Sequence, residues 1–336
     1  MRILIIKLAA IGDVIMASSM IPALRSRHPA AHITWLVGSL ASPLVAALPG
    51  VDEVISIDEK ALLRGSLFQR VRTVVGVWGR LRGRRFDLIV TAHPDRRFGL
   101  LTLGVRGRQR RALWARPMGG FVPGRHHSHE YVRLVSDRDG PEMLSGEVPV
   151  FTPPLPAALA QRLETSAKLV LLAPGGASNT MRDSPMRRWP VTCYRALAEK
   201  LIEAGHRVVL IGAPSDIWVR EHFQGIDTVD LLGETGLVDL VAVMRRAALV
   251  VSHDSMSAHM PRLAGVPVVA LFGPTDPGWF AYPDARSRVL WGGAGRPCRP
   301  CYDGKEFTPC EEVMCMKSLS VDIVMAAVND VLASNG

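Results

Sequence analysis

Short runs of apolar, β-branched residues alternate along the chain with stretches whose apolar residues recur at helical spacing. In the first half, the pattern predicts a helix over 13–27 and strands over 2–7, 32–37, 51–57 and 86–91. In the second half, it predicts helices over 190–204 and 321–332 and strands over 168–173, 207–211, 248–251 and 266–271. Such alternation is typical of parallel sheets covered by helices on both faces. We therefore expect an α/β fold.

A proline-rich segment divides the alternation in two. Four prolines fall within residues 148–156, after the last predicted strand of the first series and before the first of the second. A chain of 336 residues is long for one domain and comfortable for two. We expect two doubly wound domains, 1–156 and 157–336, with a cleft between them and a closing helix at 321–332.

The composition is that of a globular protein without a membrane span. Apolar residues make up 48% of the chain and charged residues 21%. No apolar run reaches the roughly 18 residues that a spanning helix needs. Lys7 and Asp13 interrupt the apolar start of the chain, which is unlike a signal peptide. We therefore expect a cytoplasmic protein.

Basic residues are concentrated in one window of the chain. The formal net charge is +9, and residues 60–138 alone carry 18 lysines and arginines against four acids. Arg106, Arg108, Arg110 and Arg111 fall within six residues. Such a surface is either solvated arginine or a site for a polyanion, namely nucleic acid, a phosphorylated glycolipid or an anionic membrane. No nucleic-acid-binding motif accompanies the charge.

Residues 248–277 combine several features of a nucleotide site. An apolar strand ends in Ser252-His253-Asp254, and a polar helix start with His259 one turn in is followed by a second buried strand. Free N–H groups at a helix start attract phosphate, and a carboxylate at the end of a strand can bind ribose hydroxyls. An ordinary βαβ unit with Asp254 as the helix N-cap explains the spacing equally well.

A second loop carries glycines followed by arginines. Gly175 and Gly176 follow a predicted strand and precede arginines at 182, 187 and 188. Glycines allow backbone N–H groups to approach a ligand, so this pattern fits a diphosphate clamp or, alternatively, a flexible basic loop. Neither this loop nor residues 8–13 contain a dinucleotide fingerprint or a P-loop.

Three segments together resemble a known family. Residues 2–24 (RILIIKLAAIGDVIMASSMIPAL), 174–190 (PGGASNTMRDSPMRRWP) and 251–277 are similar, in order and spacing, to the signature regions of glycosyltransferase family 9. The family comprises the ADP-heptose transferases of lipopolysaccharide inner-core assembly and their relatives. The resemblance implies a GT-B fold, in which two Rossmann-like domains face each other across a cleft. It also implies an N-terminal acceptor domain and a C-terminal nucleotide-sugar domain.

The resemblance implies roles for single residues as well. Asp13 matches the general base of the family, and a carboxylate is suited to take the proton of an attacking hydroxyl. Its local alternative is a helix N-cap. Arg187 stands where the family commonly has a lysine that contacts donor phosphates, and we expect Arg188 to assist it.

The donor would also contact the segment after the strand 248–251. Asp254, Ser255 and His259 match the D-[ST]-G-x-x-H element around the ribose and phosphates of ADP, with Met256 in place of the usual glycine. We expect Asp254 to bind the ribose. Backbone N–H groups at Ser178, Asn179 and Ser255 are expected to stabilise the departing diphosphate.

Four cysteines form a compact set near the end of the chain. The pattern Cys298-x2-Cys301-x8-Cys310-x4-Cys315 could hold a structural zinc or iron ion, or could consist of ordinary free thiols. Stable disulfides are not expected in the cytoplasm. We expect catalysis without a metal, and the one D-x-D sequence, at 137–139, is interpreted as a charge cluster at a helix end.

The resemblance, together with these observations, implies an inverting glycosyltransferase that moves heptose, or a similar sugar, from an ADP-sugar to an anionic glycolipid of the lipopolysaccharide inner core. Arg106, Arg108, Arg110 and Arg111 are expected to receive the acceptor, with peripheral contact at the inner face of the inner membrane. No nucleic-acid partner is expected. The alternatives are a relative that glycosylates a protein or uses another nucleotide sugar, and a noncatalytic protein that binds polyanions.

Overall fold

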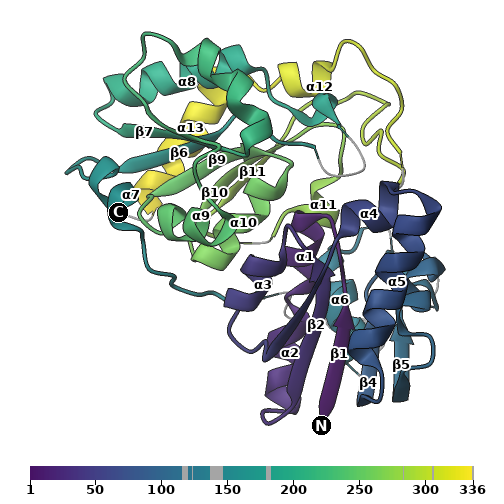
Figure 1. The fold of residues 1–336 in the computed structure, drawn as a ribbon. Helices are drawn as coiled ribbons and strands as arrows, with labels where there is room; N and C mark the ends of the chain where they lie inside the picture. Colours follow the sequence, from purple (N-terminus) through teal and green to yellow (C-terminus); the bar gives the residue numbers. More distant parts are fainter. Residues whose placement is uncertain are drawn as a thin grey trace. The chain divides into compact units, whose positions relative to one another are not determined.

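The computed structural model describes residues 1–115, 120–122, 124–136, 147–178, 183–282, 284–304 and 306–334. The chain divides into two compact units, Met1–Phe151 and Thr152–Gly336 (Figure 1). The division falls within the proline-rich segment, slightly before residue 156. Helices flank the sheet in each unit, as expected for an α/β fold. Among the described residues, none of the helices is both long and apolar enough to cross a membrane.

The first unit contains a five-stranded parallel sheet in the order β3-β2-β1-β4-β5. Its described elements are β1 (Arg2–Ile6), α1 (Ile11–Ala17), α2 (Met20–Arg27), β2 (His32–Gly38), α3 (Ser42–Ala47), β3 (Glu53–Ile57), α4 (Glu59–Arg64), α5 (Leu67–Leu81), β4 (Arg85–Thr91), η1 (Arg96–Thr102), β5 (Arg106–Ala112), η2 (Leu113–Ala115) and α6 (His127–Val135). Ile6 at the end of β1 pairs with Leu36 and Thr91. The loops that follow β1 and β4 therefore meet at one edge of the sheet.

The second unit contains a six-stranded parallel sheet in the order β11-β10-β9-β6-β7-β8. Its described elements are α7 (Ala157–Arg162), β6 (Leu169–Ala173), η4 (Pro185–Arg187), α8 (Val191–Glu203), β7 (Arg207–Gly212), η5 (Pro214–Phe223), β8 (Val229–Leu232), α9 (Leu237–Met244), β9 (Leu249–His253), α10 (Met256–Ala264), β10 (Val268–Phe272), α11 (Pro277–Phe280), β11 (Arg288–Trp291), α12 (Met314–Lys317) and α13 (Val321–Ser334). Ala173 pairs with Ser252, and Leu271 with His253. The loops after β6, β9 and β10 therefore share one edge.

The structure differs from the predicted elements in two ways. The single helix expected over 13–27 is two helices, because the chain breaks at Ser18 and Ser19, whose hydroxyls donate to the carbonyls of Ile15 and Met16. Hydroxyls that bond to their own backbone compete with continuous helix. The strands β5, β8 and β11 were not predicted from the sequence. The first of these is an arginine-rich edge strand, and charged residues at a sheet edge discourage pairing with further strands.

Candidate active site

Asp13 lies just beyond the carboxyl end of β1, in the first turn of α1. The N-cap of this helix is Ala10, so the alternative that made Asp13 the N-cap is wrong. Oδ2 of Asp13 is 2.9 Å from Nζ of Lys7; the lysine side chain is 2% exposed and the aspartate side chain 36% exposed. Asp13 therefore presents an accessible carboxylate whose orientation is set by a buried cation.

Lys7 has no role among those predicted from the sequence. The indole N–H of Trp35 donates to its carbonyl at 3.2 Å, and its own N–H donates to the carbonyl of Leu36. Its Nζ lies 5.6 Å from the ring centroid of Tyr131. Burying an ammonium group is costly unless it is paired. A lysine directly after the apolar run of β1 was the signal that could have identified it.

His93 holds the same loop from the neighbouring strand. It follows β4, and its Nε2 accepts the N–H of Leu8 at 2.9 Å. The ring stacks on Phe98 with a centroid distance of 3.7 Å. Burial, and then the charge of Lys7, lower the pKa of His93 well below its usual 6.5, so the imidazole is neutral at neutral pH. A neutral imidazole can keep accepting this backbone hydrogen bond, which positions the loop between β1 and α1.

Asp254 and Arg187 meet in the second unit although 67 residues separate them. Asp254 follows β9 and is 3% exposed. Its Oδ2 accepts a hydrogen bond from Oγ1 of Thr275 at 2.7 Å and lies 3.5 Å from Nη1 of Arg187. The N-cap of α10 is Ser255, whose hydroxyl accepts the N–H of Ser257, so the interpretation of Asp254 as the N-cap is wrong.

The loop after β6 packs against the start of α10. Gly176 has φ +85°, and a Cβ at this position would touch Ser255 at 3.4 Å. A Cβ on Gly175 would lie 2.4 Å from the Asp216 side chain. That carboxylate accepts the N–H groups of Gly176 and Ala213, each at 2.8 Å. The glycines therefore permit both the backbone turn and the close approach.

The two arginines predicted to bind the donor differ in their contacts. Nε of Arg188 donates to the carbonyl of Gly176 at 2.9 Å, and its Nη2 is 2.6 Å from Asp183. These contacts hold the loop in place. The side chain of Arg187 is 19% exposed, and its buried Nε has no hydrogen-bond partner among the described residues. Since buried donors are normally satisfied, Arg187 is the better candidate for binding an anion.

The other predicted positions differ in how far the structure describes them. Ser178 forms an isolated antiparallel bridge with Asp183, whereas Asn179, Arg182 and the D-x-D sequence at 137–139 lie outside the described residues. His259 is 5% exposed, and its ring lies 6.1 Å from that of Tyr282.

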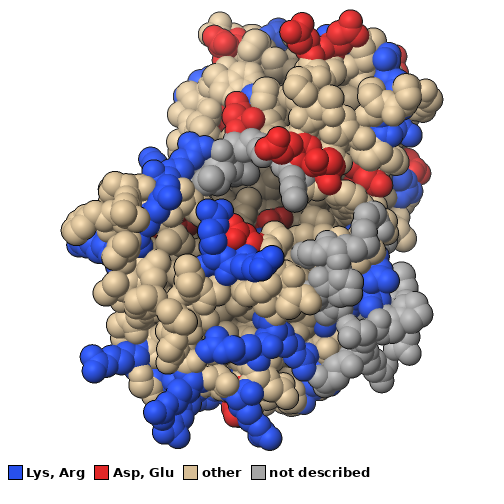
Figure 2. All heavy atoms as spheres, turned by 90° about the vertical axis from the view of Figure 1, so that its right-hand side faces the viewer, with Lys and Arg blue, Asp and Glu red and all other residues tan. Residues whose placement is uncertain are grey.

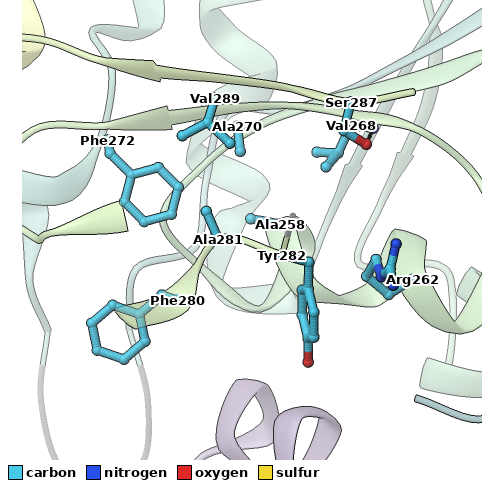
Figure 3. A pocket seen from close by; sticks show the side chains of 10 residues that line it. All are labelled: Ala258, Arg262, Val268, Ala270, Phe272, Phe280, Ala281, Tyr282, Ser287 and Val289. Atoms are coloured by element: carbon cyan, nitrogen blue, oxygen red, sulfur yellow. Dashed lines mark hydrogen bonds between the residues drawn. The ribbon is translucent and has the colours of Figure 1, made fainter. Parts of the chain in front are cut away.

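Figure 3 shows a small, largely apolar pocket between α10, α11 and the strands β10 and β11. Its volume is about 10 Å³, room for about one water molecule, so it cannot hold a nucleotide. The lining residues are Ala258, Arg262, Val268, Ala270, Phe272, Phe280, Ala281, Tyr282, Ser287 and Val289.

His253 supports the end of β9 beneath Asp254. Its N–H donates to the hydroxyl of Tyr194 at 3.0 Å, and its Nδ1 is 3.1 Å from the same oxygen. Burial, followed by the charge of Arg187, lowers the pKa of His253 from 6.5 to about 3. The imidazole is therefore neutral at neutral pH. Sequence reasoning placed His253 only as part of a polar loop.

The four arginines assigned to the acceptor lie on the edge strand β5. Arg110 donates to the hydroxyl of Thr102 at 3.1 Å, and Arg111 donates to the carbonyl of Ser136 at 3.0 Å. The side chains of Arg106 and Arg108 are exposed and make no hydrogen bond or ion pair with any described residue. Two of the four cations are therefore engaged in structural contacts, and two are available to a ligand.

The register separates Arg106 from the candidate base. Arg106 pairs with Arg85 at the amino end of the parallel strands, whereas Ala112 pairs with Thr91 at the carboxyl end. Asp13 follows the carboxyl end of β1. A strand of seven residues is roughly 20 Å long, so an acceptor would need to span about that distance to reach both.

The four cysteines are all free thiols. Cys298 and Cys310 are exposed, whereas Cys301 and Cys315 are partly buried. Burial, and then the neighbouring thiols, raise the pKa of Cys301. Within the described ranges, no group of three or more His, Cys, Asp or Glu side chains is arranged to hold a metal ion. The structure therefore gives no support to the structural metal site.

Comparisons with known proteins agree with one another. The family model for glycosyltransferase family 9 (heptosyltransferase) matches residues 141–310. The lipopolysaccharide core heptosyltransferase OpsX of Haemophilus influenzae is 24% identical over 297 residues, which cover 81% of this chain and 79% of the relative.

Solved structures share the fold over nearly the whole chain. A family 9 glycosyl transferase from Veillonella parvula has a TM-score of 0.78 at 20% identity, covering 99% of this chain and 97% of that one. The structure of E. coli heptosyltransferase WaaC with ADP has a TM-score of 0.75 at 18% identity, covering 98% of this chain and 100% of that one. These likenesses confirm the predicted GT-B class of the fold.

Proposed function

Because this chain belongs to glycosyltransferase family 9, we propose that it transfers heptose from ADP-heptose to an anionic acceptor of the lipopolysaccharide inner core. The family match, which covers half of the chain, carries this proposal. The chain is a glycosyltransferase, which argues against the noncatalytic alternative. The names of its relatives, which are lipopolysaccharide and lipooligosaccharide heptosyltransferases, support the sugar and the acceptor class.

In this proposal, the donor diphosphate binds in the second unit beside Arg187. The 3.5 Å contact between Arg187 and Asp254 is long for an ion pair, so the guanidinium can turn toward a phosphate while Asp254 stays held by Thr275. The N–H groups at Ser178, Asn179 and Ser255 add donors for the negative charge that develops on the leaving ADP. Asp254 binds the ribose. His259 lies near the start of α10, the helix that follows Asp254.

One residue acts as the general base for the acceptor hydroxyl. Its hydroxyl oxygen attacks the anomeric carbon from the face opposite the departing diphosphate, and the bond to ADP breaks, so the configuration inverts. Asp13 accepts the proton that this hydroxyl loses. Lys7 fixes the orientation of the carboxylate, and orientation of this kind is a large part of what an enzyme supplies.

Isothermal calorimetry against ADP, UDP, GDP and adenosine tests the donor. We expect ADP to bind most tightly, because the base and the diphosphate would both be recognised. Equal affinity for UDP or GDP would contradict the ADP-sugar donor while leaving the family assignment intact. Adenosine is the control for the diphosphate, since it lacks the charge that Arg187 is proposed to bind.

The acceptor is tested separately by transfer from ADP-heptose. Heptose should appear on lipopolysaccharide inner-core acceptors that carry phosphate or Kdo, and should not appear on acceptors stripped of these anionic groups. Transfer to polypeptide with no transfer to the glycolipid would favour the protein-glycosylating alternative. Transfer from another ADP-sugar, with no transfer from ADP-heptose, would show that the donor carries a different sugar and would leave the rest of the proposal intact.

A further inference from the structure

Helix α5 carries two apolar faces. One, formed by Val77 and Leu81, is buried in the core of the first unit at 2% and 1% exposure. The other is exposed to solvent. Its members, 51% to 78% exposed, are Leu67, Phe68, Val71 and Val75. An amphipathic helix that only covers its own sheet would carry polar residues there, so the second face needs an explanation.

The exposed apolar residues form one continuous stripe. Residues 67, 71 and 75 are four apart, so their side chains lie above one another on the same side of the helix. Leu100 and Leu103, at η1 and just beyond it, are also exposed at 53% and 62%. The indole N–H of Trp78 donates to the carbonyl of Leu100 at 2.8 Å, which joins this segment to α5. Scattered apolar residues are normal on a surface, but a cluster marks an interaction site.

The stripe is bordered by positive charge. Residues 60–85 contain eight lysines and arginines and no aspartate or glutamate. Within the described chain, the side chains of Arg72, Arg82 and Arg96 are exposed and make no hydrogen bond or ion pair. Figure 2 looks onto the side of the molecule that carries α5 in Figure 1, and basic side chains lie there among uncharged surface. These cations are therefore available to an anionic partner.

We propose that this stripe and its arginines dock the protein onto an anionic lipid bilayer. A helix that lies in the bilayer interface buries its apolar face among acyl chains and holds its basic residues at the headgroups. A polybasic segment is attracted to anionic lipid within about a Debye length of the surface. An anionic bilayer therefore accounts for both the apolar stripe and the basic residues beside it.

The charge pattern disfavours a second copy of the chain as the occupant. A two-fold dimer would place the same face on both sides of the interface. The segment 60–85 of one copy, with eight cations and no acid, would then oppose the identical segment of the other. Like charges in apposition disfavour association. Nucleic acid would use the arginines but would leave the aliphatic side chains of Leu67 and Val71 without a role.

Vesicle flotation tests the proposal without requiring turnover, so its result is independent of the proposed function. The probes are vesicles of phosphatidylcholine alone and of phosphatidylcholine with about one third phosphatidylglycerol, a composition chosen for its anionic surface. We expect at least about tenfold tighter binding to the anionic vesicles at low salt, and loss of that preference as salt rises.

Two variants separate the apolar and the charged contributions. Leu67→Ser with Val71→Ser removes apolar contact at exposed positions and should weaken vesicle binding at least about tenfold without lowering the melting temperature. Arg72→Gln with Arg82→Gln should weaken it at least about fivefold and flatten the salt dependence.

Matched controls lie in the second unit. Ile323→Ser changes an exposed apolar residue on α13, at 48% exposure. Arg246→Gln with Arg296→Gln removes two exposed cations. Both controls should float like the wild type. Equal binding to neutral and anionic vesicles, or unchanged binding of the α5 variants, would overturn the proposal. A dimer that the α5 variants dissociate, with no vesicle binding, would assign the face to self-association instead.

Discussion

Asp13 owes its orientation to a charge that the fold buries. Lys7 contributes an ammonium that is almost wholly enclosed, and the carboxylate of Asp13 meets it at 2.9 Å. Removing the carboxylate altogether would leave this buried cation without its partner, which would destabilise the fold. A useful substitution at position 13 must therefore keep an oxygen that can accept from Nζ of Lys7.

Asparagine meets that requirement. Its amide oxygen can accept from Lys7, but an amide takes up no proton at neutral pH. Asp13→Asn should lower turnover at least about a hundredfold, whereas ADP affinity stays unchanged. Steady-state kinetics and calorimetry provide the two measurements, and the melting temperature reports on folding. Turnover close to that of the wild type would show that Asp13 has only a structural role.

Arg187 and Arg188 form a natural pair for comparison. Arg187→Ala should cost ADP about 1–3 kcal/mol of binding free energy, the range for charge-assisted hydrogen bonds, with a small change in melting temperature. Arg188→Ala should instead lower the melting temperature, because Arg188 holds the carbonyl of Gly176 and the carboxylate of Asp183. If Arg188→Ala loses more ADP affinity than Arg187→Ala with folding intact, the two roles are reversed.

The strand β9 ends on a histidine that cannot easily take up a proton. The pKa of His253 falls from 6.5 to about 3 because burial and Arg187 disfavour the imidazolium. Between these pH values the unfolded chain binds a proton that the folded chain does not. Stability is therefore full above about pH 6.5 and declines as the pH falls toward 3.

The expected slope follows from this one proton. At most about 1.4 kcal/mol of unfolding free energy is lost per pH unit below pH 6.5, and His93 acts in the same direction. Thermal melts at pH 7.5 and pH 5 measure the loss. His253→Gln cannot titrate and should lose less stability than the wild type between the two pH values, whatever its own absolute stability. Equal losses would show that His253 is already protonated in the folded protein near pH 5.

The cysteine-bearing segment packs through its backbone. A Cβ on Gly292 would lie 1.9 Å from the carbonyl oxygen of Cys315, and one on Gly293 would lie 2.8 Å from its Cβ. Cys310 is exposed, and its sulfur accepts the N–H of Val313 at 3.4 Å. Among the described residues, no three of these thiols are arranged to hold a metal ion.

We therefore expect purified protein to carry much less than one equivalent of zinc or iron by elemental analysis. Cys298→Ser, at an exposed thiol, should leave the melting temperature unchanged, as should treatment with a chelator. One equivalent of metal that is lost on Cys298→Ser, together with a fall in stability, would instead establish the four-cysteine site, since metal-binding energy would then be folding energy.

At the scale of the whole molecule, the charge is uneven. The formal net charge of the chain is +9. Residues 60–138 alone carry +14, so the rest of the chain is negative. Long-range attraction of an anionic acceptor would act on the first unit, whereas Arg187 and Asp254 belong to the second. The two substrates should therefore respond separately to mutation.

Arg106→Gln with Arg108→Gln tests that separation. The double variant should raise the apparent KM for the glycolipid and flatten its salt dependence, because salt screens long-range attraction. ADP affinity should not change. Arg110→Gln serves as the contrast, since its hydrogen bond to Thr102 predicts a lower melting temperature. Loss of ADP binding with an unchanged acceptor KM would show that the substrates are assigned to the wrong units.

Much of the fold followed from local pattern. The strands at β1, β2, β6, β7, β9 and β10 were predicted close to their observed positions, because apolar residues predominate in each of them. The break between α1 and α2 and the edge strand β5 were missed. In both places the polar residues involved are compatible with more than one local structure, and the neighbouring strands or helices decide between them.

The candidate site depended more on tertiary structure. The sequence by itself offered Asp13, Asp254, Arg187 and the glycine loop as candidates, because these stand in motifs that follow strands. Only the folded chain decided that Lys7 orients Asp13 and that the Arg187 and Asp254 side chains meet. Those pairings depend on the register of parallel strands and on which side chains are buried. Local periodicity predicts that a strand forms, but it does not say which distant residue lies beside it.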